Sequence, residues 1–446
     1  MNYLIDDYIF DTERLIFYSR FLTDSIVNTI NNEFVKEDIS RLYYILDNLE
    51  TSNMSLYGKF PTTGIICPTN NCQLACAYCS NNSSCNNISS LSTQDVLALA
   101  KYLSKNQKIK QLKTKKNEQV VIYFSGGGEP TFHWDIFVNM VNTLKQYFIT
   151  NGVSYSFDIT TNGILNNDQR HFISSNFNNV MLSYDGISSL QNFNRPLRGI
   201  NDSSSIVEES LLFFSHTVPT RVRTTLWPDK INYLTIIADN IYSNFSNIVE
   251  WSILPVNNTG RAIENGSQEM YDCNKYNFAD AFINICKYVN ERYGKDNVVS
   301  PTFNNNLVPI YCGSSNVKSL TLMPNKTLVT CMEETSHMPI VGIIDNGTIN
   351  IFESYTDDLM AVTKEKFTEC KHCLAYPFCR GGCPAKFLRD SEYRIHSATW
   401  DCQMIINYWT IIFKELLKGN DFMGWTFDRF KINDINHPFV FRLKKL

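Results

Sequence analysis

The stretch Cys72-Gln73-Leu74-Ala75-Cys76-Ala77-Tyr78-Cys79 places three cysteines in one short loop, and the interpretation of the chain starts from it. Its spacing is C-x3-C-x2-C, with an aromatic residue directly before the last cysteine. Three thiolates at this spacing can each bind a different iron of one [4Fe–4S] cluster and leave the fourth iron without a protein ligand. A zinc knuckle or unlinked thiols are the alternatives, but zinc sites usually combine two C-x2–4-C pairs. The loop therefore favours an iron–sulfur cluster.

The composition excludes several other classes of protein. The chain has 446 residues, which is enough for a large catalytic domain and one or two smaller ones. Its net charge of −4 gives no positive surface of the kind that nucleic acid attracts. The N-terminus lacks the pattern of a signal peptide, and no stretch approaches the ~20 apolar residues of a membrane span. We therefore expect a soluble, cytoplasmic protein without a nucleic-acid or membrane partner.

The chain contains 14 cysteines, and in a reducing compartment clustered cysteines bind metal more often than they form disulfides. Four of them, Cys67, Cys85, Cys273 and Cys286, show no ligand spacing, and we expect small buried residues or surface thiols there. The other ten fall into groups with ligand spacing: the three in the loop above, and Cys312, Cys331, Cys370, Cys373, Cys379, Cys383 and Cys402.

An alternation of strands and helices begins near residue 62. Strands are predicted at 63–67, 119–124, 155–160, 180–183, 221–226 and 249–255, since these segments are rich in Ile, Val, Tyr and Thr. Helices are predicted between them at 92–104, 134–148, 168–176, 203–216 and 229–245, the first with a capping signal at Ser92 to Asp95. The pattern indicates an α/β fold with a parallel sheet, as a partial barrel or a doubly wound sheet.

Loops with special chemistry follow the first four predicted strands. The cysteine loop comes first, followed by the glycine-rich segment 126–130, then Thr161-Asn162-Gly163, then Tyr184-Asp185-Gly186. Because ligands bind at the C-terminal ends of parallel strands, we expect these loops to form one site. The glycines would let the backbone approach a ligand closely, but they do not form a G-x-G-x-x-G dinucleotide motif.

The cysteine loop with its Tyr78-Cys79 pair, together with Gly126-Gly127-Gly128-Glu129-Pro130, resembles the motifs of the radical S-adenosylmethionine (SAM) enzymes. In that family the open iron is chelated by the methionine end of SAM. Reduction of SAM yields a 5′-deoxyadenosyl radical that abstracts hydrogen from a substrate. The resemblance implies a partial (β/α)6 TIM-like barrel.

The resemblance also implies which residues contact SAM. The glycines and Glu129 would meet its ammonium group, and Tyr78 would lie near the adenine. Ser183 and Arg195 would surround the carboxylate and ribose, where a bidentate arginine suits a carboxylate. Arg195 could instead form an ordinary salt bridge, and Asn162 could simply hold its turn. The SAM-contacting residues predicted in this way are Tyr78, Gly127, Gly128, Glu129, Asn162, Ser183, Arg195 and Leu254.

The C-terminal cysteines, with their C-x2-C-x5-C-x3-C block, resemble the SPASM extension, which carries one or two auxiliary [4Fe–4S] clusters. The family usually has a glycine where this chain has Lys326, and some members have a cysteine where it has Asn306. The inner cluster could therefore have an open iron that binds substrate or water, or Cys273 or Cys286 could complete it. A zinc ribbon is the alternative, although seven ligands do not match one or two zinc sites. The resemblance assigns Cys312, Cys331 and Cys383 to an inner cluster, and Cys370, Cys373, Cys379 and Cys402 to an outer one.

SPASM members act on peptides, so the expected function is a maturase that installs a carbon–carbon or thioether crosslink in a ribosomally made precursor peptide. A flavodoxin- or ferredoxin-like protein would supply electrons. One alternative is formylglycine formation in a sulfatase, where a catalytic Asp follows the inner-cluster cysteine. Here Met332-Glu333-Glu334 follow Cys331, which counts against it. The other alternative is a non-catalytic iron–sulfur or zinc scaffold. Candidate bases are Asp185, Glu333 and Glu334.

Five segments are expected along the chain. Residues 1–60 would form a small α+β cap or peptide-recognition module, with strands at 3–10 and 15–21 and a helix at 39–49. Residues 61–256 would form the radical SAM partial barrel, at whose end the strand–helix alternation stops. Residues 257–305 would form a bridge and 306–410 the SPASM domain. Residues 411–446 would contain a helix end near Leu417 and an irregular aromatic tail packed on the barrel.

Overall fold

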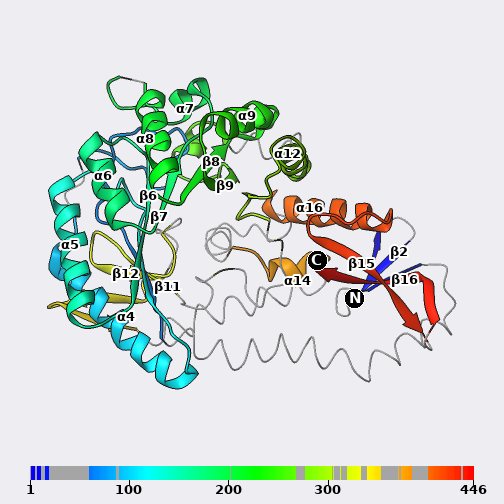
Figure 1. The fold of residues 1–446 in the computed structure, drawn as a ribbon, viewed down its shortest axis with the longest axis horizontal. Helices are drawn as coiled ribbons and strands as arrows, with labels where there is room; N and C mark the ends of the chain where they lie inside the picture. The colour runs from blue at the N-terminus through cyan, green and yellow to red at the C-terminus, as the bar shows by residue number, and fades with distance from the viewer. Residues whose placement is uncertain are drawn as a thin grey trace.

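The computed structural model describes residues 2–5, 8–11, 16–19, 60–86, 90–200, 202–267, 277–303, 305, 312, 319–332, 339–352, 370, 373–383, 400–432 and 435–445. Figure 1 shows a curved parallel sheet with helices on its outer side, and a smaller antiparallel sheet beside helix α16. No helix in these ranges is long and apolar enough to cross a membrane. The predicted helix at 39–49 lies outside the described residues.

The large sheet contains the six predicted parallel strands in sequence order, which confirms the α/β partial barrel. Each strand of this series leads through at least one helix to the next. The elements are β4 (Thr63–Ile66), α4 (Thr93–Thr114), β5 (Val120–Phe124), α5 (Trp134–Thr150), β6 (Tyr155–Thr161), α6 (Asn167–Asn176), β7 (Asn179–Ser183), α7 (Ser188–Asn194), α8 (Ser204–Thr217), β8 (Thr220–Leu226), η2 (Pro228–Tyr233), α9 (Leu234–Asn244) and β9 (Ile248–Pro255).

The strands bury one face against the helices and turn the other toward the inside of the barrel. In β8, the alternate residues Thr220, Val222, Thr224 and Leu226 are buried, whereas those between them are partly exposed. Two of the latter, Arg223 and Thr225, line a cavity inside the barrel. The strand period of two therefore separates a packing face from a face that carries polar side chains.

The sheet extends beyond the six predicted strands at both edges. After β9, helix α12 (Phe278–Tyr293) leads to a two-residue strand, β10 (Val298–Val299), which is parallel to β9. The prediction that the alternation stops near residue 256 was therefore wrong, because so short a strand leaves no pattern. At the other edge β11 (Ser319–Leu322) is parallel to β4, and the antiparallel strands β12 (Thr327–Val329), β13 (Gly342–Asp345) and β14 (Thr348–Ile351) follow.

The turn between β11 and β12 forms with Lys326 at the position where the SPASM resemblance expects glycine. Lys326 has φ 68, in the left-handed region that favours glycine, and its amide donates to the Met323 carbonyl at 2.9 Å. Its ammonium lies 3.2 Å from Asp95, which belongs to the capping box of α4. The lysine thereby connects the hairpin to the start of a barrel helix.

The two ends of the chain meet in a five-stranded antiparallel sheet of order β1-β2-β3-β16-β15. The tail predicted to be irregular forms two strands, and the predicted strand at 3–10 is divided in two, so both predictions were wrong. Helix α16 (Trp400–Leu417) ends where predicted and precedes the last two strands. The strands are β1 (Asn2–Ile5), β2 (Tyr8–Asp11), β3 (Ile16–Ser19), β15 (Trp425–Ile432) and β16 (Ile435–Lys445).

Candidate active site

A cavity of about 220 Å³ lies inside the barrel, where the loops after the strands meet. Its wall contains the three loop cysteines and every residue that the sequence predicted to contact SAM. Asp185 does not line it, and Glu333 and Glu334 lie outside the described residues. The predicted residues in the wall are Cys72, Cys76, Tyr78, Cys79, Gly127, Gly128, Glu129, Asn162, Ser183, Arg195 and Leu254.

The three cysteines of the loop form one part of this wall. At the start of the loop, the Cys72 amide donates a hydrogen bond to the Ser84 carbonyl at 2.8 Å. Burial raises the pKa of Cys72 to about 12 and that of Cys76 to about 11, so both are protonated thiols at neutral pH without iron. The Asn162 amide group donates to Cys72 Sγ at 3.6 Å. Three sulfur donors around one cavity fit a cubane cluster with one open iron.

The glycine loop lies against the backbone that precedes the cysteines. The Gly128 amide donates to the Thr69 carbonyl and the Glu129 amide to the Asn71 carbonyl, each at 2.8 Å. A Cβ atom on Gly128 would lie 2.0 Å from the Asn71 carbonyl oxygen, so no larger residue fits there. Gly127 has φ 68, and a Cβ atom on it would lie 2.9 Å from the Thr69 carbonyl oxygen. Close packing of two loops is therefore one reason for these glycines.

Glu129 is a buried carboxylate whose orientation is fixed by its neighbours. Its Oε1 accepts hydrogen bonds from the hydroxyls of Thr131 and Thr161, both at 2.8 Å, and its Oε2 accepts from the Asn162 amide at 2.8 Å. Burial raises its pKa, although these donors act in the opposite direction. A carboxylate held in this way at a cavity wall suits a cationic ligand group such as an ammonium.

Asp185 lies behind the cavity wall, at the end of β7. Its carboxylate accepts from Arg195 Nε at 3.1 Å, from the Asn194 side chain at 3.0 Å and from the Thr225 amide at 3.0 Å. The Tyr78 hydroxyl also donates to it. Asp185 is thus surrounded by protein donors. A base that acts on a substrate would face the cavity, and Asp185 does not.

Arg195 lines the cavity while its guanidinium is held by other residues. It pairs with Asp185 and lies over the Tyr78 ring, with 5.2 Å from Cζ to the ring centroid. Burial alone would lower the pKa of Arg195, but the Asp185 carboxylate raises it, so the side chain stays charged. The sequence left open a SAM contact or an ordinary loop salt bridge. The structure shows a buried ion pair that also borders the cavity.

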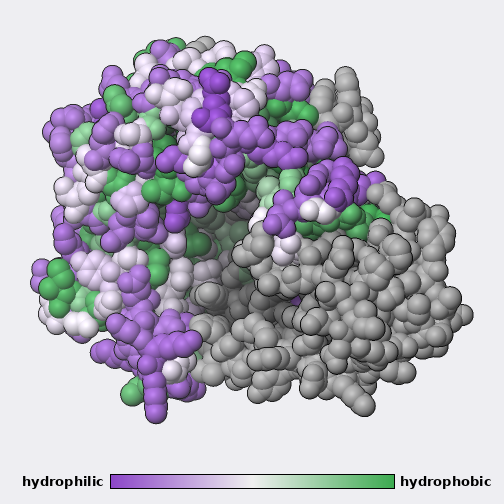
Figure 2. Space-filling view, turned by 45° about the vertical axis from the view of Figure 1, so that its right-hand side comes forward, coloured by the Kyte–Doolittle hydropathy of each residue, from purple (hydrophilic) through white to green (hydrophobic). Residues whose placement is uncertain are grey.

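A second cavity, of about 1120 Å³, adjoins the first and shares Arg223, Leu254, Pro255 and Asn257 with it. Helix α12 contributes Cys286 and its neighbours to the wall. Figure 2 shows that the molecule is hollowed near the middle of one face, with hydrophobic residues in the wall of the hollow. The second cavity is also lined by the three cysteines that the sequence assigned to an inner cluster, Cys312, Cys331 and Cys383.

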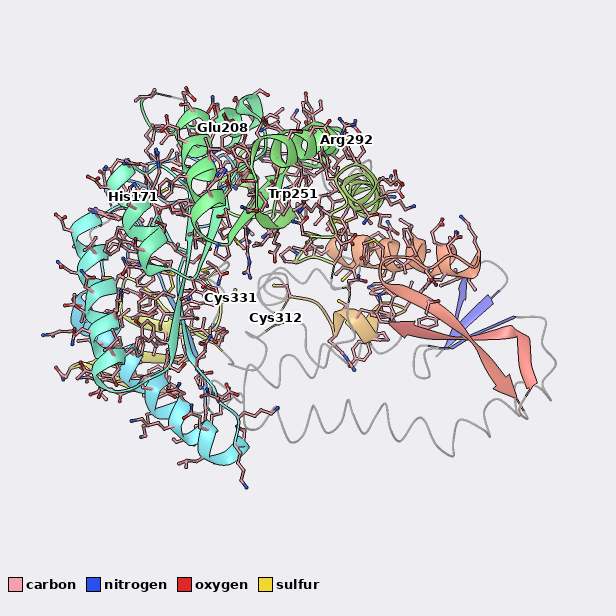
Figure 3. The ribbon with its side chains drawn as sticks, viewed as in Figure 1. His171, Glu208, Trp251, Arg292, Cys312 and Cys331 are labelled. Atoms are coloured by element: carbon pink, nitrogen blue, oxygen red, sulfur yellow. The ribbon has the colours of Figure 1, made fainter. Side chains whose placement is uncertain are left out.

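The cysteines assigned to auxiliary clusters follow the barrel in the sequence, and the last of them, Cys402, lies on α16. In Figure 3, Cys312 and Cys331 are seen between the barrel strands and the short helix α14 (Tyr376–Cys379). The Cys373 amide donates to the Cys370 carbonyl at 2.8 Å. Burial raises the pKa of Cys373, and Cys402 on α16 is close enough to add to this effect. The outer set therefore comes from the turn at Cys370 and Cys373, the end of α14 at Cys379 and the start of α16 at Cys402.

Several residues of the site were not predicted from the sequence. Arg198 and Arg261 each donate to the Ser83 carbonyl at 2.8 Å and so hold the far end of the cysteine loop. Met332, directly after Cys331, lines the smaller cavity, and its sulfur would lie 2.4 Å from a Cβ atom on Gly126. Arg223 could have been found, because the strand period places it on the inner face of β8.

The partial barrel and the three-cysteine loop at its rim define the class of protein, and the family comparison agrees. Residues 66–228 match the radical SAM superfamily. The chain therefore contains a radical SAM domain, whose family cofactors are SAM and a [4Fe–4S] cluster.

A curated relative and two solved structures are similar to the chain. The serine-type anaerobic sulfatase-maturating enzyme of Klebsiella aerogenes is 24% identical over 275 residues, or 58% of this chain and 65% of the relative. The structure of anSMEcpe with bound AdoMet matches with a TM-score of 0.61 at 17% identity and covers 80% of this chain and 98% of that one. Streptococcus suis SuiB bound to its precursor peptide SuiA matches with a TM-score of 0.53 at 15% identity and covers 87% and 97%. At these identities the two structures establish the shared fold.

Proposed function

We propose that this chain is a radical SAM maturase that crosslinks a ribosomally made peptide. The observation that carries the proposal is the small cavity, whose wall combines three cysteines, an oriented carboxylate and a buried arginine. In this proposal Cys72, Cys76 and Cys79 hold the cluster that binds SAM. Bound SAM and the reduced cluster supply a radical that removes hydrogen from an unreactive C–H bond.

The chain's own residues would bind and orient SAM. Glu129 would accept hydrogen bonds from the ammonium group, because its carboxylate is already aimed by three neighbours. The Arg195 guanidinium and the Ser183 end of β7 would meet the carboxylate and ribose, while Tyr78 and Leu254 would pack near the adenine. The barrel wall around the site would help to keep water from the radical.

The larger cavity is the proposed peptide site. It measures about 1120 Å³, and an inner cluster on Cys312, Cys331 and Cys383 would occupy part of this space and leave the rest for the peptide. The cavity meets the SAM site at Arg223 and Leu254, so a peptide bound there would adjoin bound SAM. Two structural neighbours, anSMEcpe and SuiB, were solved with bound peptides. A small flavodoxin- or ferredoxin-like protein would supply the electrons.

Met332 favours a crosslink over formylglycine formation. In the sulfatase maturases that the C-terminal cysteines resemble, an aspartate base follows the inner-cluster cysteine. Here that position holds a thioether that packs with Cys67, Met323 and Val329 and reaches Gly126. A methionine cannot accept the substrate proton, so the chain lacks that base at that position. The seven C-terminal cysteines are proposed to hold the auxiliary clusters.

Anaerobic reconstitution tests the proposal. With iron, sulfide, SAM and dithionite, the wild-type chain should release 5′-deoxyadenosine, and Cys76→Ala should release none. Cys85→Ala is the matched control, because Cys85 is exposed in the same region and should leave the product unchanged. Zinc in place of iron, without 5′-deoxyadenosine, would show a non-catalytic scaffold.

A second measurement separates the two peptide reactions. The reconstituted enzyme is incubated with a short peptide encoded beside its gene, or with a sulfatase peptide that carries the target Cys or Ser. A crosslink removes two hydrogens from the first peptide and joins two of its residues in the fragment spectrum. An aldehyde on the second peptide, trapped by a hydrazine reagent, would instead support formylglycine formation.

A further inference from the structure

The Asp185 carboxylate accepts hydrogen bonds from four residues in or next to the wall of the proposed SAM site. It is only 1% exposed, and its oxygens accept from Arg195, Asn194, Tyr78 and the Thr225 amide. These donors come from the cysteine loop, from the C-terminal end of α7 and from strand β8. One buried side chain thus connects three parts of the chain that approach the cavity from different directions.

The segment that carries Arg195 is also bound to the cysteine loop through the backbone. The Ala75 amide donates to the Pro196 carbonyl at 2.9 Å, and the Ala77 amide donates to the Asn194 carbonyl at 2.7 Å. An isolated β-bridge between Leu74 and Leu197 lies between these contacts. Any displacement of the 194–198 segment would therefore move the loop that carries Cys76.

Asn194 and Trp227 extend the same network. The Asn194 side chain donates to Asp185 at 3.0 Å and accepts from Trp227 Nε1 at 3.0 Å. The Trp227 ring lies 6.3 Å from the Tyr78 ring. Tyr78 is therefore held by Asp185 at its hydroxyl and supported by Trp227 at its ring, while Arg195 covers its face.

The charge of Asp185 matters as much as its hydrogen bonds. Arg195 is buried, and a buried cation is costly unless an anion compensates it. Among the described residues, Arg195 forms its ion pair with Asp185. Without the carboxylate, the guanidinium would lose its compensating charge beside the SAM cavity that it lines.

We propose that Asp185 is a positioning residue of the radical SAM reaction: from behind the cavity wall it holds Tyr78 and Arg195 where they can bind SAM beside the cluster. The inference rests on the proposed SAM-binding function. It gives Asp185 a structural task in binding in place of the proton transfer suggested by the sequence.

Asp185→Asn tests the proposal, with Asp158→Asn as the matched control. Asp158 is another buried aspartate of the barrel, on β6, and it accepts from Asn179 at 2.8 Å away from the cavity wall. Iron content, equilibrium binding of SAM and the electron paramagnetic resonance (EPR) spectrum of the reduced cluster are measured for each reconstituted protein. Asp185→Asn should retain iron but bind SAM at least about tenfold more weakly, the order expected for losing charge-assisted bonds. Its cluster spectrum should change less when SAM is added.

Tyr78→Phe is the second variant, for the case that Asp185→Asn loses its iron. It removes only the hydroxyl that donates to Asp185 and keeps the ring. It should weaken SAM binding several-fold. Combining it with Asp185→Asn should add little, because both changes affect the same hydrogen bond between Tyr78 and Asp185. SAM binding within about twofold of wild type in Asp185→Asn, or in Tyr78→Phe if the first loses iron, would overturn the proposal. A wild-type protein that binds no SAM would instead contradict the proposed function.

Discussion

At the scale of single residues, glycines in this chain are required for two distinct reasons. Gly128 has an ordinary backbone conformation, but there is no room for a Cβ atom next to the Asn71 carbonyl. Gly152 has the opposite situation, with φ 61 and nothing within 4 Å of a Cβ atom. The first glycine serves the close approach of two site loops, and the second serves only a turn.

Gly128→Ala should abolish SAM binding, because the two loops would have to separate to admit the methyl group. Gly152→Ala is the control, and it should cost about 1 kcal/mol of stability while SAM binding is unchanged. Thermal melting and equilibrium SAM binding are measured for both. Normal SAM affinity in Gly128→Ala would show that the loop can shift without harm to the site.

Residues of the site could be predicted where they belong to contiguous motifs at strand ends. The cysteine loop and Gly127 to Glu129 were found in this way, whereas Arg195, at the end of α7, was predicted from the family resemblance; the structure places all of them around one cavity. Arg198 and Arg261 could not be found, because each acts by donating to the Ser83 carbonyl. A backbone carbonyl can be met by a donor from any segment, so no residue pattern marks such a contact.

At the scale of elements, helix α4 shows where sequence patterns stop being informative. Its start was predicted from the capping box of Ser92 and Asp95, which the structure contains. The helix runs to Thr114, ten residues beyond the prediction, although its last part has few apolar residues. Gln107 donates there to the Glu118 carbonyl at 2.7 Å, and Lys110 lies 3.3 Å from the Glu118 carboxylate. Buried polar groups with partners replace the apolar stripe that would have revealed the helix.

Lys326 allows a test of how the β11–β12 hairpin is joined to α4. Lys326→Ala keeps the left-handed strain and loses the contact with Asp95, whereas Lys326→Gly loses the contact but relieves the strain. We therefore expect the alanine variant to be less stable than the glycine variant by about 1 kcal/mol. Thermal unfolding of the two proteins measures this difference. Equal stabilities would mean that the turn takes another backbone conformation when the ion pair is lost.

At the scale of the whole molecule, the sequence predicted the barrel but not how the ends of the chain pair. Repeated strand–helix units are local, so their periodicity can be recognised without knowledge of the partner strands. The pairing of β3 with β16 joins residues near both ends of the chain, such as Phe17 and Phe441. Alternation along one strand does not identify its partner, and the aromatic tail was for that reason interpreted as irregular.

Phe10 is one side chain through which the N-terminal strands contact the C-terminal part of the chain. It is 0% exposed on β2, and its ring centroid lies 4.6 Å from that of Phe413 on α16. Phe10→Ala should destabilise this unit by roughly 3–5 kcal/mol, the usual range for a buried Phe. Leu112→Ala is the control, since Leu112 on α4 is 83% exposed and should change little.

Hydrogen exchange can then show whether the two ends form one cooperative unit. In Phe10→Ala, amides in β15 and β16 should exchange faster together with those in β1 to β3, because all five strands belong to one sheet that packs on α16. Amides in α4 to α6, on the barrel, should keep their wild-type rates. Faster exchange confined to the N-terminal strands would show that the C-terminal hairpin is stable alone. The strands β1 to β3 would then unfold apart from the C-terminal hairpin, and the shared sheet would not couple the two ends.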